Sequence, residues 1–81
     1  MKGDENMRCY FVTLKSGVSF RVYSDKVQRE YYDCTKSCSI EFYHKGTVAC
    51  SIKENLIETI AYIPFFSMET VIYKNGGFCE V

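Results

Sequence analysis

Apolar and polar residues alternate along most of this chain, and short turn signals interrupt the alternation. Val18, Phe20 and Val22, for example, alternate with the polar residues Ser19 and Arg21. A period of two places alternate side chains on one face of a β-strand, whereas a helix needs a period of 3.6. The pattern therefore predicts a chain built mainly from strands.

The kinds of apolar residue favour the same class. The sequence holds 7 Val, 6 Ile, 7 Tyr and 6 Phe, against 2 Leu and 2 Ala. β-branched and aromatic side chains fit a pleated, half-buried surface, and the best helix formers are scarce. A chain of 81 residues makes one domain at most. We expect a flexible N-terminus over residues 1–7 and a single β-rich domain over residues 8–81.

Turn signals divide the domain into consecutive hairpins. Asn75-Gly76-Gly77 is the strongest of these signals, because Asn and Gly accept positive φ. The other turns are expected at 15–17, 45–46 and 53–55. Strands are then expected at 9–14, 18–23, 40–44, 47–52, 56–63, 69–73 and 78–81. Consecutive hairpins predict an antiparallel meander. The pattern does not distinguish an open sheet from a small barrel of five to seven strands.

One segment shows a helical period instead. Val27, Tyr31 and Cys34 fall at positions i, i+4 and i+7, which lie on one helical stripe. Asp25 precedes them and its side chain can cap the first turn of a helix. We therefore expect one helix around residues 25–36, packed over the sheet, so that the fold class is α+β with mainly β content.

The charge of the chain limits its partners. Lys and Arg number 10 and Asp and Glu number 10, so the net charge is zero. A neutral chain lacks the long-range attraction that draws proteins to nucleic acids or acidic membranes, and it has little repulsion against self-association. No run approaches the ~20 apolar residues of a membrane span, and the first residues are polar. We expect a cytoplasmic protein that does not contact membranes.

The cysteines offer a metal site only in part. Cys34, Cys38, His44 and Cys50 supply the residue types that bind zinc. His44 and Cys50, however, do not form the second closely spaced ligand pair that structural zinc sites use. A Cys–His nucleophile lacks an orienting group, and no phosphate-binding loop or dinucleotide motif is present. We predict reduced thiols, no metal, no cofactor and no catalytic residues.

Exposed aromatic and basic residues are the remaining candidates for a site. Phe65 and Phe66 follow Pro64 in an expected turn, where at most one of them can face the core. Aromatic and Arg side chains are enriched at binding hot spots. We predict that the residues binding a partner protein are Phe65, Phe66, Tyr31, Tyr32, Arg21 and Arg29. Tyr23, Tyr31 and Tyr32, beside Arg21 and Arg29, also suit the stacking of single-stranded nucleic acid.

The segment from Ala61 to Tyr73, AYIPFFSMETVIY, resembles the closing strands of short SH3-like proteins of bacteriophages and mobile elements. In those proteins a strand ends in Ile-Pro, makes a tight turn and resumes as a β-branched strand. The resemblance covers about a sixth of the chain. It implies an SH3-like barrel and a phage-encoded protein that binds a host protein. Inhibitors of host defence, such as anti-CRISPR proteins, belong to this class.

These expectations give three hypotheses about function. The first is a non-catalytic module that binds a host protein in the bacterial cytoplasm and inhibits it by covering its surface. The second is a small barrel that binds single-stranded nucleic acid. The third is a structural phage component that forms a homo-oligomer through sheet edges.

Overall fold

The computed structural model describes residues 7–63 and 70–79. Within these ranges the chain forms eight strands and one short 3-10 helix, and every paired strand is antiparallel. The elements are β1 (Arg8–Leu14), β2 (Ser19–Ser24), β3 (Lys26–Tyr32), β4 (Ser37–His44), β5 (Thr47–Lys53), η2 (Glu54–Leu56), β6 (Ile57–Ile63), β7 (Thr70–Lys74) and β8 (Gly77–Phe78). The prediction of a mainly β, antiparallel chain is confirmed.

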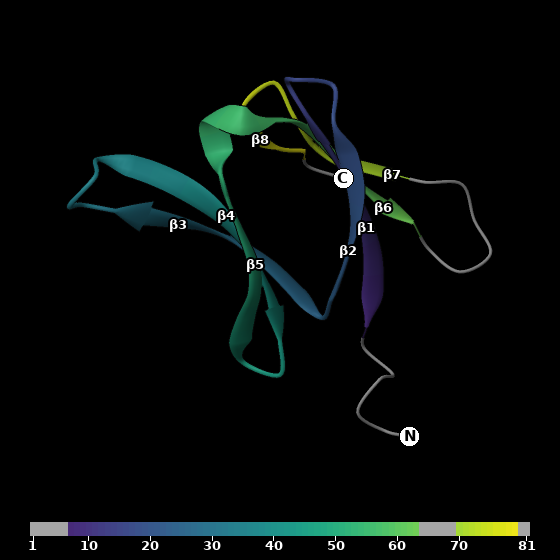
Figure 1. The fold of residues 1–81 in the computed structure, drawn as a ribbon. Coiled ribbons are helices and arrows are strands. Elements are labelled where there is room, and N and C mark those ends of the chain that lie inside the picture. Colours follow the sequence, from purple (N-terminus) through teal and green to yellow (C-terminus); the bar gives the residue numbers. More distant parts are fainter. Residues whose placement is uncertain (1–6, 64–69, 80–81) are drawn as a thin grey trace.

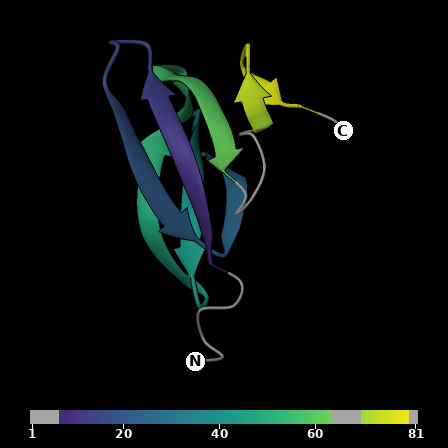
Figure 2. The ribbon, with the colours of Figure 1, turned by 90° about the vertical axis from the view of Figure 1, so that its right-hand side faces the viewer.

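The strands form two sheets. The five-stranded sheet has the order β2-β1-β6-β7-β8, and the three-stranded sheet has the order β3-β4-β5. The two sheets face each other across the middle of the molecule (Figure 1). Figure 2 shows the β7–β8 hairpin at the same end of the molecule as the turn between β1 and β2.

The single residue Asp25 joins the two sheets. β2 ends at Ser24 and β3 begins at Lys26, so one run of chain leaves the first sheet and enters the second. The backbone N–H of Asp25 donates to the carbonyl of Tyr43 at 2.9 Å, and its carboxylate accepts from the N–H of Lys45 at 2.9 Å. These bonds hold the bend against the far end of β4.

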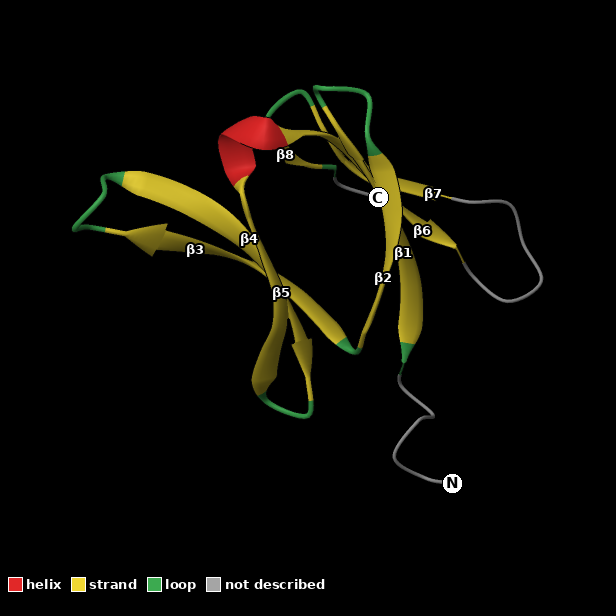
Figure 3. Ribbon diagram, viewed as in Figure 1, coloured by secondary structure: helices red, strands yellow, loops and turns green. Residues whose placement is uncertain are grey.

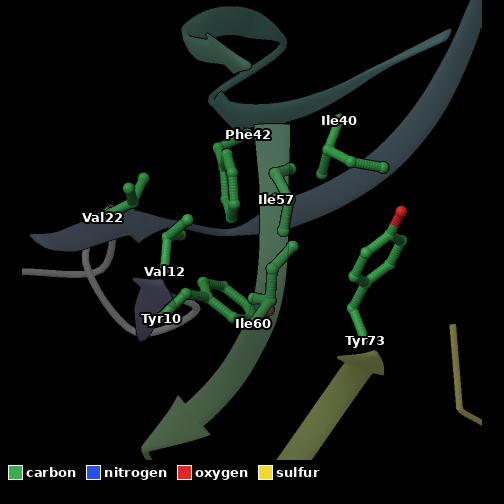
Figure 4. Close-up of a cluster of buried hydrophobic side chains, with 8 residues drawn as sticks. All are labelled: Tyr10, Val12, Val22, Ile40, Phe42, Ile57, Ile60 and Tyr73. Atoms are coloured by element: carbon green, nitrogen blue, oxygen red, sulfur yellow. The ribbon is translucent and has the colours of Figure 1, made fainter. Parts of the chain in front are cut away.

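The core lies between the two sheets. Ile40 and Phe42 of β4 point toward side chains of the five-stranded sheet (Figure 4). The rings of Phe42 and Tyr10 are 5.7 Å apart between centroids, in a tilted arrangement. The buried cluster consists of Tyr10, Val12, Val22, Ile40, Phe42, Ile57, Ile60 and Tyr73. It draws on both sheets, so the sheets stabilise each other by burying one apolar surface.

The hairpins expected at three of the four turns are confirmed. β1 pairs with β2, β4 with β5 and β7 with β8. The turns Lys45-Gly46 and Asn75-Gly76 have positive φ at both residues, which is the geometry of type I′ hairpin turns. The local sequence therefore favours the β4–β5 and β7–β8 hairpins. The hairpin expected at 53–55 is wrong, because β5 and β6 lie in different sheets and are joined by η2. β6 pairs with β1 instead, so the strand order is not that of a simple meander.

The predicted helix over residues 25–36 is wrong. Residues 26–32 form β3, which pairs with β4 from Lys26↔Tyr43 to Tyr32↔Ser37, and a turn follows. Figure 3 shows η2 as the only helical element among the residues it describes. Of the supposed helical stripe only Val27 packs against the core, while Tyr31 and Cys34 are exposed. Pairing with β4 outweighs a weak local helical pattern.

The alternation of side chains fails in β6. A strict period of two puts Ile57 and Ala61 on one face and Glu58 and Ile60 on the other, but Ile57, Ile60 and Ala61 are all buried. The pairing of β6 is irregular on both sides. Its register with β1 shifts between Thr13 and Leu14, and its register with β7 shifts between Ile60 and Ala61. A bulge shifts the alternation by one residue, so a strict period of two fails here.

Candidate functional site

The structure separates the predicted site residues. Arg29 and Tyr31 are two positions apart in β3 and lie on the same face, which faces η2 and the β7–β8 turn. Tyr32 lies on the opposite face of β3, and Arg21 lies on β2 in the five-stranded sheet. Phe65 and Phe66 lie outside the described residues. Of the six predicted residues, Arg29 and Tyr31 therefore share a site.

This site is a surface hollow of about 480 Å³. The β3–β4 hairpin forms one wall and the β7–β8 turn forms another. Residues of the β1–β2 turn and of η2 complete the hollow. Its lining residues are Lys15, Tyr31, Lys36, Ser37, Cys38, Glu54, Asn55, Ile57, Tyr73 and Gly76. We call these residues, with the adjoining Arg29, the η2 hollow.

Glu54 is the central polar residue of the η2 hollow. Its Oε2 accepts hydrogen bonds from Nε of Arg29 at 2.9 Å and from the hydroxyl of Tyr73 at 2.7 Å. Nη2 of Arg29 also contacts this carboxylate and donates to the carbonyl of Gly76 at 3.0 Å. The cluster thus ties together β3, η2, β7 and the β7–β8 turn.

The ionisation of the cluster follows from these contacts. Partial burial alone raises the pKa of Glu54, but the hydrogen bonds from Tyr73 and Arg29 and the guanidinium charge outweigh it. The net pKa of Glu54 is below its usual value, so the carboxylate is charged at neutral pH. Burial and the hydrogen bond to Glu54 raise the pKa of Tyr73 to about 12. Its hydroxyl therefore remains a donor.

Backbone contacts fix the walls of the hollow. The N–H of Lys15 donates to the carbonyl of Leu56 at 2.9 Å, which holds the β1–β2 turn against η2. In the β3–β4 turn, Lys36 has φ of 54° and its N–H contacts the carbonyl of Asp33 at 3.3 Å. Both lysines are therefore held at the rim of the hollow by the backbone.

Tyr32 has a partner of its own on the other face of the three-stranded sheet. Its hydroxyl donates to Glu41, which is 5% exposed and also accepts from Tyr43 at 3.1 Å and Ser51 at 3.2 Å. The hydrogen bond to Glu41 and burial raise the pKa of Tyr32 to about 12. Tyr32 thus donates a hydrogen bond to a buried carboxylate, which gives it a structural role on this face of the sheet.

The four zinc-type residues are distributed along the three-stranded sheet. Cys34 is exposed in the β3–β4 turn, and Cys38 and His44 lie at opposite ends of β4. Across residues 7–63 and 70–79, no three His, Cys, Asp or Glu side chains are grouped for a metal ion. Cys50 is half-buried in β5, and burial raises the pKa of its thiol. A higher pKa leaves less of the nucleophilic thiolate at neutral pH.

Sequence reasoning missed Glu54, Tyr73 and Cys38 as parts of one site. The sequence pattern places Glu54 in an expected turn and Tyr73 in an expected strand, and it links neither to a site. They are 19 residues apart, and they meet because β7 adds to the sheet beside β6. A glutamate in a turn before a strand gives no signal of this contact.

No protein-family model, curated protein or solved structure matches this chain. Among the described residues no helix is long and apolar enough to cross a membrane. The geometry of the η2 hollow is therefore the basis for the proposals below.

Proposed function

We propose that this chain is a non-catalytic protein-binding module that holds a segment of its partner in the η2 hollow. The observation that carries the proposal is Tyr31, which is 58% exposed at the rim of a concave site. A tyrosine in that position offers a large contact area at low conformational cost, and binding sites are usually concave. Arg29, at 41% side-chain exposure, adds a second residue type that is enriched at hot spots.

We further propose that the two sheets form an SH3-like barrel. The strand that crosses between sheets at Asp25, the 3-10 helix before β6 and the pairing of β6 with β1 support this proposal. The proposed partner is a host protein in the bacterial cytoplasm, as for phage-encoded inhibitors of defence systems such as anti-CRISPR proteins. The proposed mechanism is occlusion of the partner's surface.

The size of the molecule is compatible with occlusion. The chain exposes 5771 Å² in total, and a standard interface covers about 800 Å² on each partner, or about a seventh of this surface. An inhibitor of this size therefore has enough area for one stable interface.

The test is capture of the partner from a bacterial lysate by tagged protein, with and without nuclease. Wild-type protein and Tyr31→Ala are compared, with Tyr23→Ala as the control because Tyr23 is equally exposed on the other sheet. The proposal predicts a stoichiometric partner that survives nuclease and is lost with Tyr31→Ala alone. A partner retained equally by all three proteins contradicts the η2 hollow as its site.

A second candidate function is binding of single-stranded nucleic acid. The outer face of the five-stranded sheet favours it, because Arg21 pairs directly with Phe11, and Tyr23 pairs with the next outward residue, Cys9. Lys74, paired with Thr59, lies on the same face. Aromatic rings beside cations on a sheet surface suit base stacking and phosphate contacts. Loss of all captured material on nuclease treatment would favour this function over the first.

A further inference from the structure

We propose that the partner segment in the η2 hollow is acidic. This inference rests on the proposed protein-binding function and names the chemistry of the partner. Three cations surround the hollow, namely Lys15, Lys36 and Arg29. Two carboxylates oppose them, Glu54 in the lining and Asp33 beside Lys36, so three positive and two negative charges leave a net charge of +1. The balance of charge therefore favours an anionic occupant.

Arg29 and Glu54 form an ion pair with no net charge, so the net positive charge of the hollow comes from the two lysines. Arg29 and Tyr73 direct three hydrogen bonds at a single oxygen of its carboxylate. A carboxylate saturated in this way repels an incoming anion less than a free one does. Asp33 is the other nearby acid, and it lies 3.6 Å from Lys36 with both side chains more than three-quarters exposed. Such exposed pairs are weak and exchange readily.

Arg29 retains free hydrogen-bonding capacity toward a ligand. Its bonds to described residues come from Nε and Nη2, whereas Nη1 has no partner within residues 7–63 and 70–79. Glu54 and the Gly76 carbonyl hold the guanidinium in place. A carboxylate of the partner can therefore accept from Nη1 without breaking the bonds that position Arg29.

Lys36 is a lining residue of the hollow with an unusual backbone conformation. Its φ of 54° is a conformation that glycine and asparagine adopt at lower cost. Lysine also occupies such a position at Lys45, in the β4–β5 turn, which is not part of the hollow. The two lysines share a backbone geometry but only Lys36 lines the η2 hollow, so they form a matched pair for an experiment.

The dimensions favour a peptide over a nucleic acid. The hollow holds about 480 Å³, which suits a few side chains, and its cations surround a concavity. Nucleic acids need a basic stripe that follows several phosphates. A short segment with one or two acidic side chains, placed beside Tyr31, fits this arrangement.

The experiment uses two fluorescein-labelled ten-residue peptides, one alternating Glu and Ser and one with Gln in place of Glu. Binding to the full chain is followed by fluorescence anisotropy at low and high salt, and the site is located by amide chemical shifts. We expect the Glu peptide to bind at least tenfold more tightly than the Gln peptide and to weaken with salt. The shifted amides should include those of Lys15, Tyr31, Lys36 and Gly76.

Substitution of the matched lysines tests the site itself. Lys36→Gly should weaken binding of the Glu peptide by about two- to fivefold, as expected for one exposed ion pair. Lys45→Gly should leave binding unchanged. Both variants keep the fold, because glycine accepts the positive φ at each position.

Three results would overturn the inference. Equal binding of both peptides in the hollow would remove the acidic preference and leave the hollow as a protein-binding site. No shift in the hollow with either peptide would also refute the inference, while the proposed function is judged separately by partner capture with Tyr31→Ala. Displacement of the Glu peptide by an equimolar ten-nucleotide oligo-dT would assign the hollow to nucleic acid instead.

Discussion

At the scale of single residues, the η2 hollow depends on Tyr73. Its ring is fully buried in the core, and its hydroxyl reaches Glu54 at the surface of the hollow. One side chain therefore belongs both to the packing between sheets and to the candidate site. The sequence shows an aromatic residue in a strand but not the direction of its hydroxyl, which depends on contacts that only the folded chain makes.

Replacing Tyr73 by Phe should cost about 1.5–3 kcal/mol of unfolding free energy, because the hydrogen bond to a charged carboxylate is lost while the ring stays packed. The measurement is urea unfolding followed by circular dichroism. Tyr23→Phe is the control, since Tyr23 is 58% exposed, and it should change stability by less than about 0.5 kcal/mol. Equal effects of the two substitutions would contradict a specific role for the Tyr73 hydroxyl.

The raised tyrosine pKa values predict a loss of stability in alkali. The pKa of Tyr73 and that of Tyr32 are each about 12 in the folded chain, against an ordinary 10.0. The folded state thus holds these protons more tightly, so its stability is complete below pH 10 and falls as the pH rises toward 12.

Urea unfolding at pH 8, 10 and 11 measures this dependence. Tyr73→Phe and Tyr32→Phe should each reduce the fall in unfolding free energy between pH 10 and 11, because each removes one shifted group. A fall that is as steep in both variants as in the wild type would show that other groups cause it.

At the scale of elements, three hairpins could be predicted from the sequence, but β3 was wrongly predicted to be a helix. The hairpins follow from turn residues that accept positive φ, and these requirements are local. β3 was misassigned because three residues at helical spacing coincide with a strand whose partner, β4, lies beyond a turn. Tyr31, near the end of this strand, is exposed, although the helical pattern put it on the same stripe as Val27.

The β4–β5 turn provides a test of this local control. Gly46 has φ of 82°, and no atom beyond its chain neighbours lies within 4 Å of an added Cβ. Gly46→Ala should therefore destabilise the chain by about 1 kcal/mol through backbone strain alone. Gly77→Ala meets no neighbouring atom and has no positive φ, so it should be close to neutral by thermal unfolding. A neutral Gly46→Ala would argue against the type I′ turn.

At the scale of the whole molecule, one buried cluster holds two sheets together. The sheets are joined through the bend at Asp25 and through residues such as Phe42 and Tyr10, which meet across the interface. A period of two along the expected strands 9–14 and 40–44 puts Tyr10 on one face with Val12, and Ile40 on one face with Phe42. It did not predict which sheet each face would meet, because strand order depends on contacts between distant segments.

Phe42→Ala should remove the central contact between the sheets. The side chain is fully buried, so the substitution should cost about 3–5 kcal/mol, which is a large part of the ~5–15 kcal/mol typical of small domains. Near-ultraviolet circular dichroism and urea unfolding measure the loss. Tyr31→Ala is the comparison, and it should stay within about 1 kcal/mol because Tyr31 is exposed. Equal losses would contradict the position of the core.

The position of β1 between β2 and β6 in its sheet has a consequence for synthesis on the ribosome. β2 follows β1 directly in the chain, but the other neighbour of β1, β6, begins only at Ile57. At roughly 5–20 residues per second, the nascent hairpin waits for several seconds with one edge of β1 unpaired. During that interval the growing chain presents an open strand edge to other nascent chains, and chaperones that cover such edges would raise the yield of folded protein.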